Sequence, residues 1–202
     1  MLLHDLAAGM NPRRVRIFLA EKGMTVPMRA VDGAAGETRS AAFLALNPLG
    51  TLPVLELDDG TVLAESIAIC RWFESQQPDP PMFGRTPLEQ AQVEMWTRRM
   101  ELELARPIVD TFVHTGAYFR DRVRQLPDYA EVSRARALEA MHWLDRELAG
   151  RAFIATADYT VADIVAQCAL VLGKATGLRV PAECTELARW FASVAARPTA
   201  RA

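Results

Sequence analysis

The chain has 202 residues, 50% of them hydrophobic, and a formal net charge of −2 at pH 7. This apolar content is enough to build a folded core, and it excludes an intrinsically disordered chain. The near-neutral charge balance lacks the basic footprint of a protein that binds nucleic acid or acidic membranes, so we expect neither partner.

Residues 1–77 alternate short apolar strands with helical segments, which predicts an α/β domain resembling the thioredoxin fold. The elements expected before residue 47 are a strand at 2–6, a helix at 12–22, a strand at 26–31 and a short helix at 40–45. In the first helix, Asn11 suits the N-cap and Pro12 the first helical position, so unpaired N–H groups there would form a positive site. Three arginines follow in the first turns, where the helix dipole favours anions: Arg13, Arg14 and Arg16. We interpret them as solvated side chains, with a nearby anionic ligand as the alternative.

The stretch at 47–69, NPLGTLPVLELDDGTVLAESIAI, predicts a strand opened by a proline, a turn, a second strand and the start of a helix. Asp59-Gly60 is a strong hairpin turn signal between the two apolar runs. Pro53 is expected at a strand entrance, a position tolerated on an edge strand. If its peptide bond is cis, the N–H and C=O of Leu52 turn outward and can pair with an extended peptide ligand.

The helix after this hairpin predicts a site for an α-amino acid. Ser66 is a suitable N-cap, and its hydroxyl together with the nearby N–H groups would bind an anion. Glu65 beside it would accept an ammonium group. A plain helix cap and a plain first-turn acid are the alternatives, but the position directly after the hairpin favours ligand binding.

Four prolines between residues 78 and 87 predict a linker, followed by an all-α helical-bundle domain at 88–202. Its expected helices lie at 88–124, 128–149, 161–176 and 183–196. Pro107 should bend the first of them and aim His114 at a cleft between the domains. Thr160 and Asp163 form a predicted capping box that opens a helix apolar nearly all round, which should be the buried centre of this domain.

The cysteines and the N-terminus indicate a protein of the cytoplasm. Cys70, Cys168 and Cys184 are widely spaced and form no metal pattern, so we interpret them as buried reduced thiols. The N-terminus lacks the features of a signal peptide, and the longest apolar run is too short to span a bilayer.

Several motifs together resemble those of cytosolic glutathione transferases, in the same order and over nearly the whole chain. They are NPRRVRIFLAEKG at 11–23, the stretch at 47–69, GRTPLEQ at 84–90, ELEL at 101–104, YTVADI at 159–164 and VPAEC at 180–184. The similarity is greatest to an atypical class that lacks the usual catalytic Ser, Tyr or Cys. This chain has no Ser, Cys, Tyr or Thr between Leu6 and Arg16, where related enzymes usually carry that residue.

The resemblance implies a homodimeric transferase that joins glutathione, its co-substrate, to a small hydrophobic electrophile, without a metal or other cofactor. It implies that glutathione binds at Leu52, Pro53, Glu65 and Ser66, with Arg39 on its glycine carboxylate. Thiol activation then falls to Asn11 and to a water held by His114. An apolar pocket for the electrophile is expected around Phe112, Tyr118 and Trp96.

Alternatives to these assignments remain open at the level of the sequence. In the alternative interpretation neither residue takes part in catalysis: Asn11 is a helix cap, and His114 is a surface or packing residue. For the whole protein, the alternatives are a glutathione-dependent peroxidase or isomerase, or a non-catalytic glutathione-binding interaction module.

Overall fold

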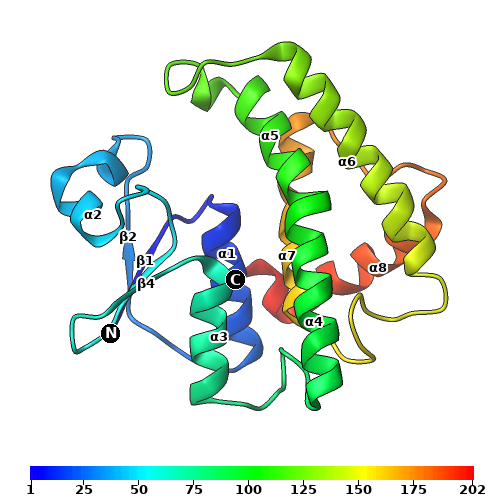
Figure 1. Ribbon diagram of the computed structural model, residues 1–202, viewed down its shortest axis with the longest axis horizontal. Helices are drawn as coiled ribbons and strands as arrows, with labels where there is room; N and C mark the ends of the chain where they lie inside the picture. The colour runs from blue at the N-terminus through cyan, green and yellow to red at the C-terminus, as the bar shows by residue number, and fades with distance from the viewer. The chain divides into compact units, whose positions relative to one another are not determined.

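In the computed structural model, which describes all 202 residues, the chain divides into two compact units (Figure 1). The first, the N-terminal unit, comprises Met1–Pro81 together with Arg201–Ala202. The second, the C-terminal unit, comprises Met82–Ala200. Residues 78–87 lie across this division.

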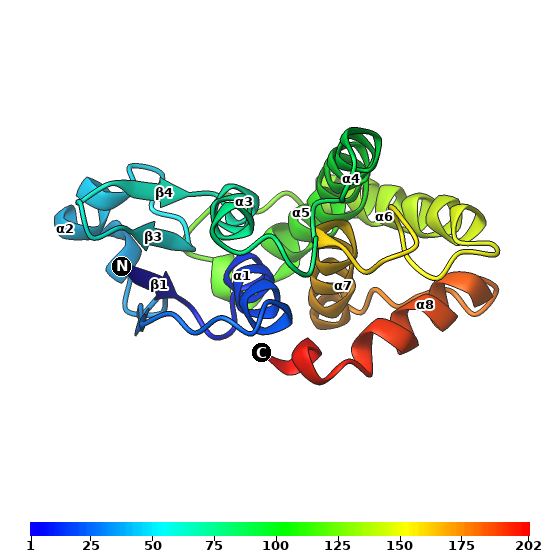
Figure 2. The same cartoon turned by 90° about the horizontal axis from the view of Figure 1, so that it is seen from below.

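The N-terminal unit is a small mixed sheet with helices on both faces. Its strands are β1 (Leu2–Asp5), β2 (Met28–Ala30), β3 (Val54–Glu56) and β4 (Val62–Ala64), in the order β2-β1-β3-β4. Only the β1–β2 pair is parallel. The helices are α1 (Met10–Glu21), α2 (Ala41–Leu46) and α3 (Ser66–Gln76), with a 3₁₀ turn η1 at Glu37–Arg39. Figure 2 shows α1 and α3 together on one face of the sheet and α2 on the other, which confirms the predicted thioredoxin-like layer.

The structure confirms Pro53 at a strand entrance but corrects the expectation of an edge strand. β3 lies between β1 and β4, so it is an internal strand, not an edge strand. Pro53 is tolerated because it stands immediately before Val54, the first residue of β3, where the ladder needs no N–H from it.

A fully buried lysine ties the helices of the N-terminal unit to residues 77–80. The side chain of Lys22 has no exposed surface, and its Nζ lies 2.6 Å from a carboxylate oxygen of Glu74 at the end of α3. The same ammonium donates to the carbonyl oxygens of Gln77 at 2.8 Å, of Pro78 at 3.0 Å and of Pro80. The burial of this charge is therefore compensated by a carboxylate and three carbonyl groups.

The C-terminal unit is helical throughout, as the sequence predicts. Its elements are α4 (Pro87–Arg99), a π-helical segment η2 (Met100–Ala105), α5 (Arg106–Thr115), α6 (Pro127–Glu147), α7 (Val161–Gly173) and α8 (Thr185–Ala195), with 3₁₀ turns η3 (Ala117–Phe119), η4 (Lys174–Thr176) and η5 (Pro198–Arg201). The helix predicted at 88–124 ends earlier, at Thr115. Gly116 leaves the helical conformation with ψ 134, and the Gln125 side chain donates to the carbonyls of Val113 and Gly116, which replaces a further helical turn.

The bend predicted at Pro107 takes the form of a π turn just before it. Proline has no N–H to donate to the carbonyl four residues earlier, and its ring would clash with that carbonyl. The preceding turn is widened: the N–H of Arg106 bonds to the carbonyl of Glu101, five residues back. A π turn of this kind accommodates the proline without breaking the helix.

Helix α7 is the buried centre of the C-terminal unit, as predicted. Every residue from Val161 to Leu170 is buried. The capping box forms, and the Asp163 carboxylate accepts the N–H of Thr160 at 3.0 Å. None of the helices combines the length and apolar character needed to cross a lipid bilayer.

Candidate functional site in the N-terminal unit

The β3–β4 hairpin brings the predicted glutathione-binding residues together. Val54, the first residue of β3, pairs with Ala64, the last residue of β4. Leu52-Pro53 directly precedes the first of these and Glu65-Ser66 directly follows the second, so both dipeptides lie at the same end of the hairpin. The register is fixed by the predicted turn, where the N–H of Leu57 bonds to the carbonyl of Thr61 at 2.8 Å.

The peptide bond between Leu52 and Pro53 is cis. Neither the N–H nor the C=O of Leu52 has a hydrogen-bond partner within the chain, whereas the strand that begins two residues later is paired on both sides. The Leu52 side chain is half-buried and packs on the core cluster of Val31, Phe43 and Val54. Leu52 is thus anchored by its side chain while its main chain offers one donor and one acceptor.

Glu65 has the only positive φ among the non-glycine residues, with φ 68 and ψ 117. A side-chain-bearing residue in this region costs about 1–3 kcal/mol and persists where the surroundings impose it. The carboxylate of Glu65 is exposed and has no hydrogen-bond or ion-pair partner. The residue with this strained backbone therefore places an unpaired carboxylate at the start of α3.

The first turn of α3 is rich in hydrogen-bond donors and has no side-chain acceptor that caps them. Glu65, not Ser66, is the N-cap residue, and no side chain caps this helix, which corrects the predicted capping role of Ser66. The positive φ of Glu65 shifts the helix start by one residue. The N–H groups of Ser66, Ile67 and Ala68 have no partner in the chain. The hydroxyl of Ser66 is 4% exposed and accepts from Nη1 of Arg14 at 3.3 Å.

Arg39 lies over the loop that leads to Leu52. Its Nη1 donates to the carbonyl of Leu49 at 3.3 Å, and the side chain is exposed. Gly50 has φ +61, and a Cβ there would lie 2.8 Å from Nη1 of Arg39. A glycine is needed at this position because the backbone conformation and the carbonyl oxygen of Thr38, 2.7 Å from the position of that Cβ, exclude a side chain.

The start of α1 differs from the prediction for Asn11. The helix begins at Met10 with Gly9 as its N-cap, and no side chain caps it, so Asn11 occupies the second helical position. Gly9 is required because a Cβ would lie 2.8 Å from the Pro12 ring, which packs against it. The capping interpretation of Asn11 is therefore wrong. Its exposed amide has no partner in the chain, and Met10 and Asn11 supply the unpaired N–H groups of this terminus.

The prediction that the arginines of α1 are solvated is wrong for Arg14 and Arg16. Arg14 is only 4% exposed and contacts Ser66, which is 52 residues away in sequence. Arg16 pairs with Asp5 and donates to the carbonyl of Ala7 at 2.8 Å, which fixes the loop before the helix. The sequence does contain a signal for the burial of Arg14: this residue lies four positions before Phe18, on the same buried face of α1.

His114 belongs to the C-terminal unit, at the end of α5. Its Nδ1 accepts the N–H of Leu126 at 3.2 Å, and its ring meets that of Tyr129 edge-on at 5.1 Å. In the neutral imidazole this places the proton on Nε2, which is then a donor. His114 thus secures the start of α6 through one nitrogen and keeps the other available.

The three aromatic residues predicted to form one pocket fall into two separate clusters. Trp96 is buried and stacks on Trp143 at 5.5 Å. Phe112 packs against Phe119, which in turn contacts Tyr118. Trp96 and Phe112 stand 16 positions apart on consecutive helical segments, about 24 Å at 1.5 Å per residue, which explains why they do not meet.

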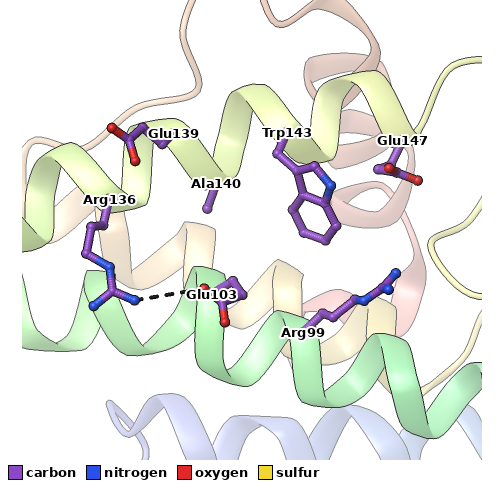
Figure 3. Close-up of a pocket in the computed structure, with 7 residues that line it drawn as sticks. All are labelled: Arg99, Glu103, Arg136, Glu139, Ala140, Trp143 and Glu147. Atoms are coloured by element: carbon purple, nitrogen blue, oxygen red, sulfur yellow. Dashed lines mark ion pairs between the residues drawn. The ribbon is translucent and has the colours of Figure 1, made fainter.

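A groove lies beside the Trp96–Trp143 pair, and it is mostly charged. It has a volume of about 500 Å³ and is lined by Arg99, Glu103, Arg136, Glu139, Ala140, Trp143 and Glu147. Figure 3 shows Ala140 and Trp143 pointing from α6 toward the facing helical segment, with the ion pair of Arg136 and Glu103 spanning the gap. This lining does not match the apolar pocket that the sequence predicts.

The cysteines are buried and form no disulfide, as expected. Cys184 lies with its sulfur 3.2 Å from Nδ1 of His142. Burial, together with the carboxylates of Asp145 and Glu183, raises the pKa of the Cys184 thiol. This thiol is therefore a protonated packing group and not an activated nucleophile.

Comparison with known proteins agrees with this geometry. Residues 10–76 match the family "Glutathione S-transferase, N-terminal domain", and residues 108–198 match "Glutathione S-transferase, C-terminal domain". The chain is 37% identical over 205 residues to Glutathione S-transferase 2 of Saccharomyces cerevisiae, which covers 100% of this chain and 88% of that protein. A shorter match, 39% identical over 95 residues, links 45% of the chain to 44% of maleylacetoacetate isomerase of Pseudomonas aeruginosa.

Solved structures resemble the chain over almost its full length. The crystal structure of Gtt2 from Saccharomyces cerevisiae has a TM-score of 0.93 at 37% identity and covers 98% of both chains. A glutathione S-transferase domain-containing protein from Marinobacter aquaeolei has a TM-score of 0.94 at 38% identity, covering 98% of this chain and 99% of that one. The chain belongs to the glutathione S-transferase family. It is a glutathione transferase, an enzyme for which glutathione is the co-substrate.

Proposed function

We propose that the protein conjugates the glutathione thiolate to small hydrophobic electrophiles, through a site of the atypical class without a catalytic Ser, Tyr or Cys. The observation that carries the proposal is the set of unpaired groups at one end of the β3–β4 hairpin. These are the main chain of Leu52, the carboxylate of Glu65 and the donors at the start of α3. Together they complement an extended peptide that ends in an α-amino acid.

Each part of glutathione has a matching group in this arrangement. The cysteine main chain pairs with the N–H and C=O of Leu52, beside Pro53, as in β-augmentation. The γ-glutamyl carboxylate binds the Ser66 hydroxyl and the first N–H groups of α3, and its ammonium binds Glu65. Arg39 binds the glycine carboxylate. These assignments use only groups that are exposed or unpaired, apart from the Ser66 hydroxyl, which still has its proton to donate.

Activation of the thiol requires more than a helix dipole. A cysteine-like thiol has a pKa of about 8.5, and one pKa unit corresponds to about 1.36 kcal/mol. The dipole at the start of α1 contributes about 0.3–1 kcal/mol. We therefore assign additional donors to the thiolate: the side-chain amide of Asn11, and Nε2 of His114 acting through a bound water. The electrophile is then attacked by a stabilised thiolate held in place.

Replacing Glu65 tests the binding site. Glu65→Ala should weaken glutathione binding about 10- to 100-fold, since a charge-assisted hydrogen bond contributes about 1.5–3 kcal/mol. Calorimetry measures this affinity. Glu65→Gly should lose as much affinity but exceed the alanine variant in stability by about 1 kcal/mol, because glycine relieves the strain at φ 68. Unchanged affinity in both variants would refute the proposed site.

Isomerase activity is a second candidate function, favoured by the 39% identity to maleylacetoacetate isomerase over 95 residues. The same thiolate can add to an unsaturated substrate and be eliminated again, so that glutathione is returned unchanged. Mass spectrometry separates the two activities: a transferase accumulates the glutathione adduct, whereas an isomerase yields product of the same mass as the substrate.

We also propose that the protein is a homodimer that associates through α4 and η2. Leu88, Met95 and Leu102 recur every seven residues along these segments and are 69%, 40% and 48% exposed. The neighbouring groove carries both charge signs, and such a surface can be self-complementary across a twofold axis. We expect the dimer mass in light scattering and the monomer mass for Met95→Glu. Val123→Glu, an exposed control outside these segments, should remain dimeric, and a monomeric wild type would contradict the proposal.

The proposed location is the cytoplasm. Cys70, Cys168 and Cys184 are buried without a disulfide, as in proteins of reducing compartments.

A further inference from the structure

The buried arginine of α1 carries an inference about how the carboxylate end of glutathione is recognised. Arg14 is 4% exposed, and its Nη1 lies 3.3 Å from the Ser66 hydroxyl oxygen, which is itself 4% exposed. The two residues come from α1 and α3, which pack against each other in the N-terminal unit. A buried arginine is rare unless its guanidinium has hydrogen-bond partners, and the Ser66 hydroxyl is one of them.

The chemistry of the two groups determines where the serine proton points. A guanidinium has five N–H donors and no acceptor, whereas a serine hydroxyl has one donor and two lone pairs. Because Arg14 donates, Ser66 must use a lone pair toward it. The hydroxyl hydrogen is therefore directed away from Arg14 and is available as a donor.

The main-chain groups in the first turn of α3 are also donors. The N–H groups of Ser66, Ile67 and Ala68 are unpaired, and no side chain caps the helix. The positive end of an 11-residue helix thus adjoins a hydroxyl whose hydrogen is directed away from Arg14. Such a cluster is complemented by a carboxylate, which only accepts hydrogen bonds and carries the opposite charge.

We propose that Arg14 is a positioning residue for the glutathione γ-glutamyl carboxylate: it fixes the orientation of the Ser66 hydroxyl. This inference rests on the proposed function, because the carboxylate is that of glutathione. Arg14 acts through Ser66 and does not itself contact the ligand. It makes the site specific for ligands with an α-carboxylate, whereas Glu65 makes it specific for the ammonium.

Calorimetry with two ligands tests the role. The first is glutathione, and the second is γ-aminobutyryl-cysteinyl-glycine, which keeps the amine and the thiol but lacks the α-carboxylate. Arg14→Met should weaken glutathione binding at least tenfold and change binding of the second ligand less than twofold. In a Ser66→Ala background the same substitution should cost less than threefold, because no hydroxyl remains to be oriented.

A neighbouring arginine supplies the control. Arg16→Met removes a partly buried guanidinium that binds Asp5 and the carbonyl of Ala7, so any effect on affinity should be equal for the two ligands. Should Arg14→Met fail to fold by circular dichroism, Arg14→Gln takes its place: the shorter polar side chain does not reach the position of Nη1, so this variant too should lose affinity for glutathione alone.

Equal weakening of both ligands by the Arg14 variants, or unchanged glutathione binding, would show a packing role and overturn the inference. A wild-type protein that does not bind glutathione at all would instead overturn the proposed function itself, and the role of Arg14 with it. The two failures are therefore distinguished by the wild-type titration.

Discussion

Replacing Asp163 by alanine is expected to lower the free energy of unfolding of the C-terminal unit by about 3–5 kcal/mol. The carboxylate is fully buried and accepts four hydrogen bonds. Its partners are the N–H of Ile154 at 2.9 Å, the N–H and hydroxyl of Thr160, and Nε1 of Trp190 at 2.9 Å. Burial raises the pKa of Asp163, while these hydrogen bonds act in the opposite direction. Alanine would leave the buried donors without an acceptor.

Chemical denaturation followed by tryptophan fluorescence measures this loss, because Trp190 itself reports on the site. Asp163→Asn should rescue little, since each oxygen accepts two bonds and the amide NH2 would face donors. Asp158→Ala is the matched control. Its ion pair with Arg85 is exposed on both sides, so its loss should cost less than about 1 kcal/mol. A change below 1 kcal/mol for Asp163→Ala would contradict this account of α7.

The parts of the site that sequence predicts well are those fixed by local interactions. The Asp59-Gly60 turn sets the register of the hairpin, and the register places Leu52 and Glu65 at one end of it. These positions follow from a few consecutive residues and from the alternation of the strands. The Thr160 capping box is equally local, and it too forms as predicted.

The errors arise where a distant residue decides the outcome. Arg14 was interpreted as solvated because its partner, Ser66, is 52 residues away. The helix predicted to continue to residue 124 ends at Thr115, where the carbonyls of Val113 and Gly116 are satisfied by Gln125 from a later loop. The aromatic residues predicted to line one pocket lie in two clusters for a different reason. Trp96, Phe112 and Tyr118 were chosen by residue type, without regard to their separation along the chain.

The start of α1 shows how a local rule can be outweighed by its neighbour. Asn11 followed by Pro12 matches the usual order of an N-cap and a first helical residue. Gly9 nevertheless takes the cap because the N–H of Gly9 bonds to the carbonyl of Leu6, which closes a turn directly before the helix. The displacement releases the Asn11 amide from capping. Because Gly9 is the cap, the Asn11 amide remains a candidate donor for the thiol.

Replacing His114 by alanine is expected to lower turnover with an aryl halide about 10- to 100-fold while changing glutathione affinity little. Below its pKa, a thiol loses about a factor of ten in its ionised fraction for each unit by which the pKa rises. Removal of the Nε2 donor should raise the bound thiol's pKa by about one to two units on this basis. Steady-state kinetics and titration of the thiolate by its ultraviolet absorbance measure the two effects independently.

The control variant has to keep the hydrogen bond that His114 accepts through Nδ1 from the N–H of Leu126. The alanine variant also removes the acceptor for the N–H of Leu126, which should cost about 1 kcal/mol of stability. His114→Asn offers an oxygen near the position of Nδ1 and retains that bond, but it has no group at Nε2. A catalytic Nε2 therefore predicts normal stability with low turnover in the asparagine variant. If turnover instead recovers together with stability, the histidine serves only to hold α6, and the thiol must be activated by the start of α1 and Asn11.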